Sequence, residues 1–280
     1  MRETFYKIPA NVQLTIALIS DLHNRNGTEV LRSLEIHKPD IITIAGDMVM
    51  GLRSDLEGLA GDRPLIEQQK NIIPFLKFCM NIAPTFISLG NHEWFLADED
   101  ISAMVSTGAH LLDNKWMEYV VNNQKIFIGG MSSVFIDNYR EFRNTQNSKY
   151  PVPPKGEKPK IKDPDSSWLS ELEKQDGYKI LLSHHPEYWS LRKPKLCEKK
   201  IDLVLSGHAH GGQIRLFGKG LYAPGQGFFP EYTKGVWMGK NGWLVVSTGL
   251  ANTSSMVPRL FNPTEVVYVR LKTSSCNVSA

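Results

Sequence analysis

The sequence predicts an α/β protein in which a largely parallel β-sheet packs face to face against a second sheet. Short β-branched runs alternate with longer amphipathic stretches along the first half of the chain, which is typical of βαβαβ units. The second half adds more apolar runs than one sheet would hold. A length of 280 residues, 41% of them hydrophobic, is enough for a sizeable core. We therefore expect one domain over residues 1–280.

The first half alternates between strands and helices. Three apolar runs are short enough to be buried strands and rich in β-branched residues: Leu14–Ser20, Ile41–Ala45 and Thr85–Leu89. Between them, Glu29–His37 and Leu65–Ala83 have the apolar spacing of helices. Because proline disrupts a helix interior, we expect Pro74 to kink or split the second helix.

The second half begins with a hairpin. Trp116–Val121 and Lys125–Gly130 flank Asn122-Asn123, a pair that tolerates the backbone of a tight turn. Further apolar runs are expected as strands at Lys179–Ser183, Asp202–Ser206, Trp243–Ser247 and Val266–Leu271.

Residues 137–163 break this pattern. The segment holds four prolines and seven lysine or arginine residues against four acidic ones, a surplus of +3. A stretch of this kind cannot bury much apolar surface, so we expect a surface insertion without regular structure. It is either a solvated loop or a basic lid over an anionic substrate.

Charge and cysteine content exclude several classes of protein. The formal net charge is +3, too small to indicate a nucleic-acid-binding surface. Cys79, Cys197 and Cys276 are widely spaced and odd in number, so neither a disulfide framework nor a cysteine-built zinc site is expected. The first residues contain no apolar h-region or cleavage site, and no apolar run has membrane-spanning length, so neither a signal peptide nor a transmembrane helix is expected. The expectation is a cytoplasmic protein, with contact to a membrane surface left open and no obligate protein partner.

Five predicted strands end in polar residues. The turns that follow them are Asp21-Leu22-His23, Gly46-Asp47, Gly90-Asn91-His92-Glu93, His184-His185-Pro186 and Gly207-His208-Ala209-His210. Six of the eight histidines lie in these turns. Open α/β sheets place their ligand sites at the carboxyl ends of the strands, so these side chains are expected to converge.

The residue types indicate a metal centre. Imidazole and carboxylate ligands without thiolate suit Mn, Fe, Zn, Ni or Co. Asp-x-His and His-x-His place both side chains on one side of an extended chain. About seven candidate ligands are too many for one tetrahedral ion, so we predict two divalent ions bridged by a shared carboxylate, with manganese favoured.

Taken together and in this order, the five turns resemble the signature of the calcineurin-like metallophosphoesterase superfamily. The run Gly207–Arg215, with Ser247–Leu250 and Pro258–Leu260, is similar to the branch of YkuE-like and YaeI-like phosphodiesterases, which is related to UDP-2,3-diacylglucosamine pyrophosphatases. The resemblance implies a four-layer α/β/β/α sandwich.

The resemblance also implies roles for the residues of the five turns. Asp21, His23, Asp47 and His210 would hold one ion, and Asn91, His184 and His208, with Asp47 as the bridge, would hold the second. A hydroxide shared by the ions would attack phosphorus in line, and His92 would contact the phosphate and help to protonate the leaving oxygen.

His185 and Glu93 each have two candidate roles. The family pattern favours His184 as the ligand, while His185 either lines the substrate pocket or packs beside Pro186. Glu93 either orients His92 or caps the following helix. Because position 96 is leucine, His92-Glu93 does not begin a zincin motif, and no serine-hydrolase elbow or Walker A loop occurs.

The predicted function is that of a two-metal phosphoesterase. We expect a phosphodiesterase or pyrophosphatase that acts on a small or lipid-linked substrate. The alternatives are a protein phosphatase or nuclease of the same superfamily, and a scaffold that has lost catalysis. Apolar residues at 221–222, 227–229 and 236–238 are expected in the core and in packed loops, or else along a groove for an acyl chain or a base.

Overall fold

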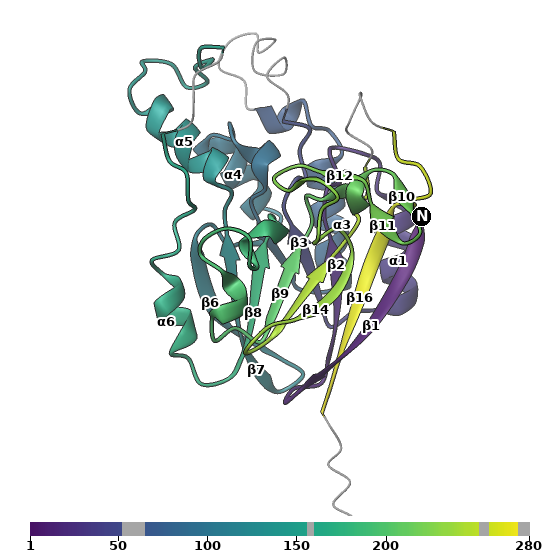
Figure 1. Cartoon of the computed structure of the whole chain (residues 1–280). Coiled ribbons are helices and arrows are strands. Elements are labelled where there is room, and N and C mark those ends of the chain that lie inside the picture. Colours follow the sequence, from purple (N-terminus) through teal and green to yellow (C-terminus); the bar gives the residue numbers. More distant parts are fainter. Residues whose placement is uncertain (52–64, 156–159, 252–257, 274–280) are drawn as a thin grey trace, which may run out of the picture.

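Two six-stranded sheets form the centre of the molecule, and helices cover their outer faces (Figure 1). The computed structural model describes residues 1–51, 65–155, 160–251 and 258–273. The predicted α/β/β/α sandwich is confirmed, with both sheets of mixed strand direction.

The first sheet carries the amino-terminal half of the fold. In spatial order it contains β1 (Arg2–Ala10), β16 (Glu265–Thr273), β2 (Leu14–Ile19), β3 (Ile41–Ala45), β4 (Thr85–Ser88) and β5 (His110–Leu111). From β2 to β5 all pairs are parallel, whereas β16 runs antiparallel to β2. The parallel strands therefore end at the same edge.

The second sheet is built mainly from the carboxy-terminal half. Its order is β14 (Gly235–Met238), β15 (Trp243–Val246), β9 (Leu203–Ser206), β8 (Tyr178–Ser183), β7 (Gln124–Met131) and β6 (Lys115–Val121). The predicted hairpin is confirmed as β6 and β7, and Asn122 and Asn123 at its turn have φ angles of 50° and 59°.

Helices cover both outer faces. The first sheet packs on α1 (Thr28–His37), α3 (Ile72–Ile82) and α4 (Asp98–Val105). The second packs on α6 (Leu169–Glu173) and the 3₁₀ turns η3 (Pro186–Tyr188) and η4 (Leu196–Glu198). Period-two alternation in the strands supplies both layers of core, since Ile16 and Leu18 face the opposite sheet while Ala17 and Ile19 face the helices.

Two elements near the amino terminus differ from the prediction. The sequence analysis assigned no strand before Leu14, but β1 pairs in parallel with β16 over its whole length. The stretch predicted as one helix over Leu65–Ala83 is the 3₁₀ turn η1 (Leu65–Glu67) followed by α3. Pro74 is the third residue of α3, where a missing N–H costs no helical hydrogen bond, so the break lies before the proline.

Residues 137–163 are not a structureless loop throughout, so this prediction was wrong for the first part of the segment. Helix α5 (Val134–Arg143) extends into it, with Ser133 as the N-cap and with Ile136 and Tyr139 buried. Tyr150 is also buried and donates a hydrogen bond to Asp100 (2.8 Å). Tyr139 and Tyr150 supply buried apolar surface, which the overall lysine and proline content of the segment did not indicate. Residues 156–159, and Cys276 near the carboxyl end, lie outside the described residues.

Short ribbons follow β9. The pairs are β10 (Arg215–Leu216) with β11 (Lys219–Gly220), and β12 (Tyr222–Ala223) with β13 (Gly227–Phe228). Val236 and Trp237 pack against the core as expected, whereas Phe228, Phe229 and Met238 are 71%, 80% and 73% exposed, so the expectation was wrong for these three. Phe228 lies in a two-stranded ribbon outside the two large sheets and Phe229 follows it, while Met238 ends the edge strand β14.

Within the described part of the chain, every helix is too short or too polar to cross a lipid bilayer.

Candidate metal centre

All the predicted site residues lie at one edge of the two sheets, where the parallel strands end. The first sheet supplies Asp21 and His23 after β2, Asp47 after β3, and Asn91 and His92 in the 3₁₀ turn η2 (Asn91–Glu93) after β4. The second sheet supplies His184 and His185 after β8, and His208 and His210 after β9.

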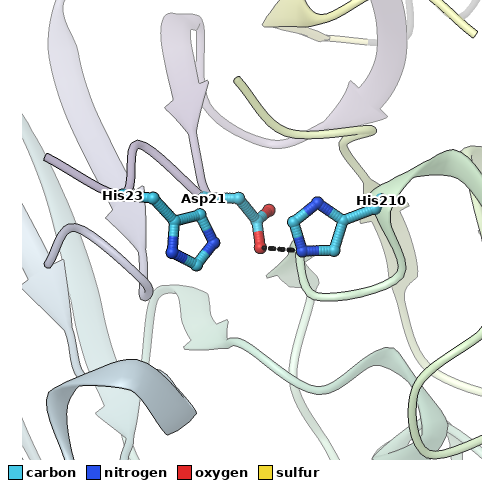
Figure 2. Close-up of side chains that lie close together, drawn as sticks. All are labelled: Asp21, His23 and His210. Atoms are coloured by element: carbon cyan, nitrogen blue, oxygen red, sulfur yellow. Dashed lines mark ion pairs between the residues drawn. The ribbon is translucent and has the colours of Figure 1, made fainter. Parts of the chain in front are cut away.

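The first cluster contains Asp21, His23 and His210, all of them buried. Their nearest ligand-type atoms lie within 4.8 Å of one another. Figure 2 shows the Asp21 carboxylate between the two imidazole rings, with His210 Nε2 3.5 Å from Asp21 Oδ1. This places an oxygen donor between two nitrogen donors.

The second cluster contains Asp47, His184 and His208. Here too the ligand-type atoms lie within 4.8 Å of one another, and all three residues are buried. Asp47 Oδ2 is 3.0 Å from His184 Nε2 and 3.7 Å from His23 Nε2. Asp47 therefore contacts a histidine from each cluster.

The backbone at these positions is in an unfavourable conformation. Five candidate ligands have positive φ angles: Asp21 54°, His23 47°, Asp47 55°, His208 65° and His210 44°. The left-handed region costs an L-residue about 1–2 kcal/mol. Strain of this size at neighbouring positions is a feature of functional sites, where the surrounding contacts hold the backbone in place.

Two glycines allow the sheets to approach each other beside the clusters. A Cβ on Gly46 would lie 2.7 Å from both Gly90 and the Nδ1 of His184, and one on Gly207 would lie 2.5 Å from the Cβ of Ser20. Across this contact His184 Nδ1 lies 2.6 Å from the carbonyl oxygen of Ala45. The Gly-Asp and Gly-His motifs thus require glycine because two sheets meet there.

The protonation states suit metal ligation in most of the cluster. Burial lowers the pKa of His23 to about 3, and burial also lowers the pKa values of His208 and His210. These rings are neutral at pH 7, as a metal ligand must be. Burial opposes the charged form of His184 as well, but the carboxylates of Asp47 and Asp21 outweigh it and raise its pKa to about 10.

The donor set fits divalent metal ions. Neither ring nitrogen of the buried His23 has a hydrogen-bond partner among the described residues, and the same is true of the buried Oδ1 of Asn91. Buried polar atoms without partners are rare, and a bound ion is one of the explanations for them. The carboxylate, imidazole and amide donors favour transition metals over structural zinc built on thiolates.

His92 lies beside the clusters and its orientation is fixed. Its ring centroid is 4.4 Å from that of His23, and its Nδ1 contacts the carbonyl oxygen of Met50. The backbone N–H of His92 donates to Asp47 Oδ1 (2.8 Å). Since Nδ1 is engaged by the protein, Nε2 is the ring nitrogen left for other contacts.

Glu93 accepts hydrogen bonds from backbone N–H groups. It neither orients His92 nor caps the following helix, which were its two predicted roles. Its carboxylate accepts hydrogen bonds from the N–H groups of Asp47, Met48, Val49 and Gly90 at 2.6–3.0 Å. The bond from Gly90 caps the 3₁₀ turn that contains Glu93, whereas α4 is capped by Asp100. Glu93 thereby connects the turn after β3 to the turn after β4.

His185 lies in a further group of buried polar residues. Its Nε2 is 2.7 Å from Ser133 Oγ, its Nδ1 is 3.4 Å from Glu187 Oε1, and its ring centroid is 4.2 Å from that of His208. The sequence analysis did not identify Ser133 or Glu187. Glu187 stands two residues after His185, so the alternation of His and Glu could have indicated the pair.

A second missed group supports His210 from the carboxyl-terminal side. Arg259 donates to the carbonyl oxygens of Ala251 and Thr248, each at 2.7 Å, and His210 Nδ1 lies 3.3 Å from the same Ala251 oxygen. Asn262 Nδ2 donates to the carbonyl oxygen of His210 (2.7 Å). These contacts connect residues 258–262 directly to the first cluster.

Sequence comparisons identify relatives over most of the chain. It is 27% identical to an uncharacterized metallophosphoesterase of Aquifex aeolicus, over 95% of this chain and 88% of that protein. It is 27% identical to YpbG of Bacillus subtilis over 76% of this chain and 67% of that one. A Caenorhabditis elegans relative is 29% identical, and the matching part spans only 38% of its length.

Solved structures with the same fold, and a family profile, complete the comparison. A 5′-nucleotidase precursor from Thermus thermophilus superposes with a TM-score of 0.51 at 12% identity, over 94% of this chain and 55% of that one. The sulfate thiohydrolase SoxB of the same organism gives 0.50 at 12% identity, over 95% and 58%. The profile of the calcineurin-like phosphoesterases matches residues 14–212, the region that contains both clusters. The chain therefore belongs to the calcineurin-like phosphoesterase family.

Proposed function

We propose that this protein is a two-metal phosphoesterase that hydrolyses phosphodiester or pyrophosphate bonds. The observation that supports this most strongly is the position of Asp47, whose Oδ2 lies near His184 in one cluster and His23 in the other. A carboxylate so placed is suited to bridge two ions.

In this proposal the ligands divide into two sets that share Asp47. Asp21, His23 and His210 complete the first set, and Asn91, His184 and His208 complete the second. When bound, the two ions would supply a water of lowered pKa and would stabilise negative charge on the phosphoryl oxygens. We favour manganese because the donors are imidazole and carboxylate, with iron, zinc, nickel and cobalt as alternatives.

His92 acts in this scheme as the proton donor to the leaving oxygen. Its Nδ1 is engaged by the carbonyl oxygen of Met50, so the proton would be delivered from Nε2. The hydrogen bond from its backbone N–H to Asp47 keeps the ring at a fixed position relative to the candidate bridge. His185, held by Ser133 and Glu187, is proposed to contact the substrate phosphate from the opposite side.

The proposed substrate is a small or lipid-linked phosphodiester or pyrophosphate. The similarity of Gly207–Arg215, Ser247–Leu250 and Pro258–Leu260 to the YkuE-like and YaeI-like branch supports this choice. Arg259 of the last motif lies close to the first cluster, through the Ala251 carbonyl that it shares with His210. The cysteines favour a cytoplasmic location, since Cys79 and Cys197 are both free thiols.

Hydrolysis of bis-p-nitrophenyl phosphate with added Mn²⁺ tests this function. We expect turnover by the wild-type protein, loss of turnover on chelation, and loss in both Asp47→Asn and His92→Ala. The two variants should differ in metal content, because only Asp47 is a proposed ligand.

Two results would contradict the proposal. One is full activity of Asp47→Asn in the presence of a chelator. The other is a wild-type protein that binds two ions yet turns over no phosphodiester, pyrophosphate or phosphomonoester, which would instead favour a scaffold without catalysis.

A further inference from the structure

The most exposed apolar side chains lie on segments that are hydrogen-bonded to the turn carrying His210. Among the described residues, five large apolar side chains are more than two-thirds exposed, and four of them are Phe217, Phe228, Phe229 and Phe261, at 104%, 71%, 80% and 80%. Leu216 and Leu260 beside them are 50% and 47% exposed. We call these six residues the aromatic rim.

Three residues of the aromatic rim are held in a backbone conformation that phenylalanine rarely adopts. Phe217, Phe229 and Phe261 have φ angles of 51°, 53° and 53°, and they are the only apolar residues with positive φ among the described non-glycine positions. Glycine is the usual residue in this region of φ. A bulky residue there is a genuine outlier, and exposed phenylalanines give the fold no packing in return.

The segments that carry the aromatic rim are joined to each other by hydrogen bonds. Arg215 N–H donates to Leu260 O (3.0 Å), and Phe229 N–H donates to Leu221 O (2.8 Å). The Arg215 guanidinium donates to Gly211 O (2.8 Å) and also bonds the carbonyl oxygen of Gly218, next to Phe217. In Figure 1 the ribbons β10, β11 and β12 lie together above the carboxyl ends of the strands.

The same segments are directly connected to the first metal cluster. Asn262, next to Phe261, donates to the carbonyl oxygens of His210 (2.7 Å) and Gln213 (2.9 Å). Leu221 N–H donates to Gly212 O (3.0 Å), which continues the turn that begins at His210. The aromatic rim therefore borders the edge at which the candidate ligands meet.

The exposed cation beside the aromatic rim is Lys219, on the same hairpin as Phe217. The other basic residues of residues 211–235 and 258–264 are engaged by the protein. Lys234 pairs with Glu265, and Arg215 and Arg259 donate to carbonyl oxygens. The acidic residue of these segments, Glu231, is exposed.

We propose that the aromatic rim docks the protein onto an anionic lipid bilayer. Phenylalanine side chains at separate hairpin and loop positions, which touch little of the protein itself, can enter the interfacial region, while the exposed Lys219 contacts acidic headgroups. Docking in this orientation turns the metal centre toward the membrane surface. The proposal depends on the surface alone and does not require the two-metal reaction.

Vesicle co-sedimentation tests the docking. The wild-type protein should bind vesicles of phosphatidylcholine with phosphatidylglycerol, and bind less to phosphatidylcholine alone. Combined replacement Phe217→Gly, Phe229→Gly and Phe261→Gly should lower the partition coefficient at least about tenfold. Lys219→Glu should lower it only for the anionic vesicles.

A matched control and a second readout separate docking from other roles. Combined replacement Ile36→Ser, Val105→Ser and Val120→Ser removes exposed apolar side chains elsewhere and should leave vesicle binding unchanged. The glycine variant should keep wild-type turnover of a water-soluble ester and a melting temperature no lower than that of the wild type, since glycine relieves the backbone strain.

Three results would overturn the proposal. The first is a wild-type protein that binds neither kind of vesicle. The second is a glycine variant that binds them as well as the wild type. The third is a wild-type dimer in light scattering that the glycine replacements dissociate, with vesicle binding unchanged, which would assign the rim to a second copy of the chain.

Discussion

The two sheets make different contributions to the metal centre. The first sheet delivers the oxygen donors Asp21, Asp47 and Asn91, together with His23. From the second sheet come only imidazoles, His184, His208 and His210. Each of the two clusters combines a carboxylate of the first sheet with an imidazole of the second.

The difference shows that neither sheet forms the centre alone. Contacts across the gap hold the two sets in place, among them His184 Nδ1 at 2.6 Å from Ala45 O and the backbone N–H of His208 at 3.2 Å from Asp21 Oδ1. The proposed metal sites therefore depend on packing between the sheets. Substitutions that weaken one sheet's contribution, or the contact between the sheets, therefore test whether the other sheet still functions.

The largest effect is expected for Asp47→Asn, which removes the carboxylate of the second cluster and with it the candidate bridge to the first. We expect hydrolysis to fall at least about a thousandfold, because residues that act as one unit lose nearly everything when one is removed. Steady-state kinetics and metal analysis of the same sample measure this. Asp113→Asn, which affects a partly buried carboxylate paired with Arg140 outside both clusters, is the control and should retain activity. Comparable losses in the two variants would contradict the role of Asp47.

Gly46→Ala tests the contact between the sheets. Its Cβ would lie 2.7 Å from His184 Nδ1, whereas a Cβ on Gly218, at nearly the same φ (81° against 79°), meets nothing within 4 Å. Both variants carry the cost of a left-handed alanine, so their difference isolates the clash. We expect Gly46→Ala to lose about 1–3 kcal/mol of unfolding free energy beyond Gly218→Ala. Equal values in urea denaturation would show that the sheets do not constrain this position.

The convergence of the candidate ligands at one edge could be predicted from the sequence because residue type and order are local properties. Asp21, His23 and His210 each follow an apolar run, and parallel strands bring their carboxyl ends to one edge. The role of Glu93 could not be predicted in full, since three of its four partners are backbone N–H groups more than forty residues away, at Asp47, Met48 and Val49. Strand β1 was not predicted, although Thr4, Tyr6 and Ile8 alternate with exposed residues. Polar residues in this segment weaken the apolar alternation by which a strand is predicted.

Helix α5, which extends into residues 137–163 from Val134, could not be predicted from the composition of that segment. Net charge and proline content describe the segment as a whole, but Ile136 and Tyr139 are spaced to bury one face of α5. The exposure of Phe217, Phe229 and Phe261 could not be predicted either. Hydrophobicity alone does not indicate whether a second layer of structure covers a residue.

Glu93→Gln should have a moderate effect, because it weakens the connection between the turns that carry Asp47 and His92. The amide keeps one accepting oxygen but loses the charge that strengthens four backbone hydrogen bonds. We expect a loss of about 1–3 kcal/mol in unfolding free energy and of about 10–100-fold in activity. Glu171→Gln removes an exposed ion pair with Lys174 and should change stability by no more than about 0.5 kcal/mol. A Glu93→Gln protein as stable as this control would contradict the assigned role.

The smallest effect concerns pH in the metal-free protein. The pKa of His184 is raised to about 10 by Asp47 and Asp21 despite burial, above its ordinary value of about 6.5. The stability that this contributes is complete below the unfolded-state pKa and is lost as the pH rises through about 10. The melting temperature of chelator-treated wild type should fall more steeply from neutral to alkaline pH than that of His184→Gln. Parallel curves would contradict the ion pair.

The stoichiometry of bound Mn²⁺ tests the central claim, that the two sheets together hold two ions. Equilibrium dialysis followed by elemental analysis should give roughly two ions per chain for the wild type. His23→Ala, in the first sheet, and His184→Ala, in the second, should each retain about one. A wild-type value of one or zero at saturation, or two ions retained in both variants, would contradict the account.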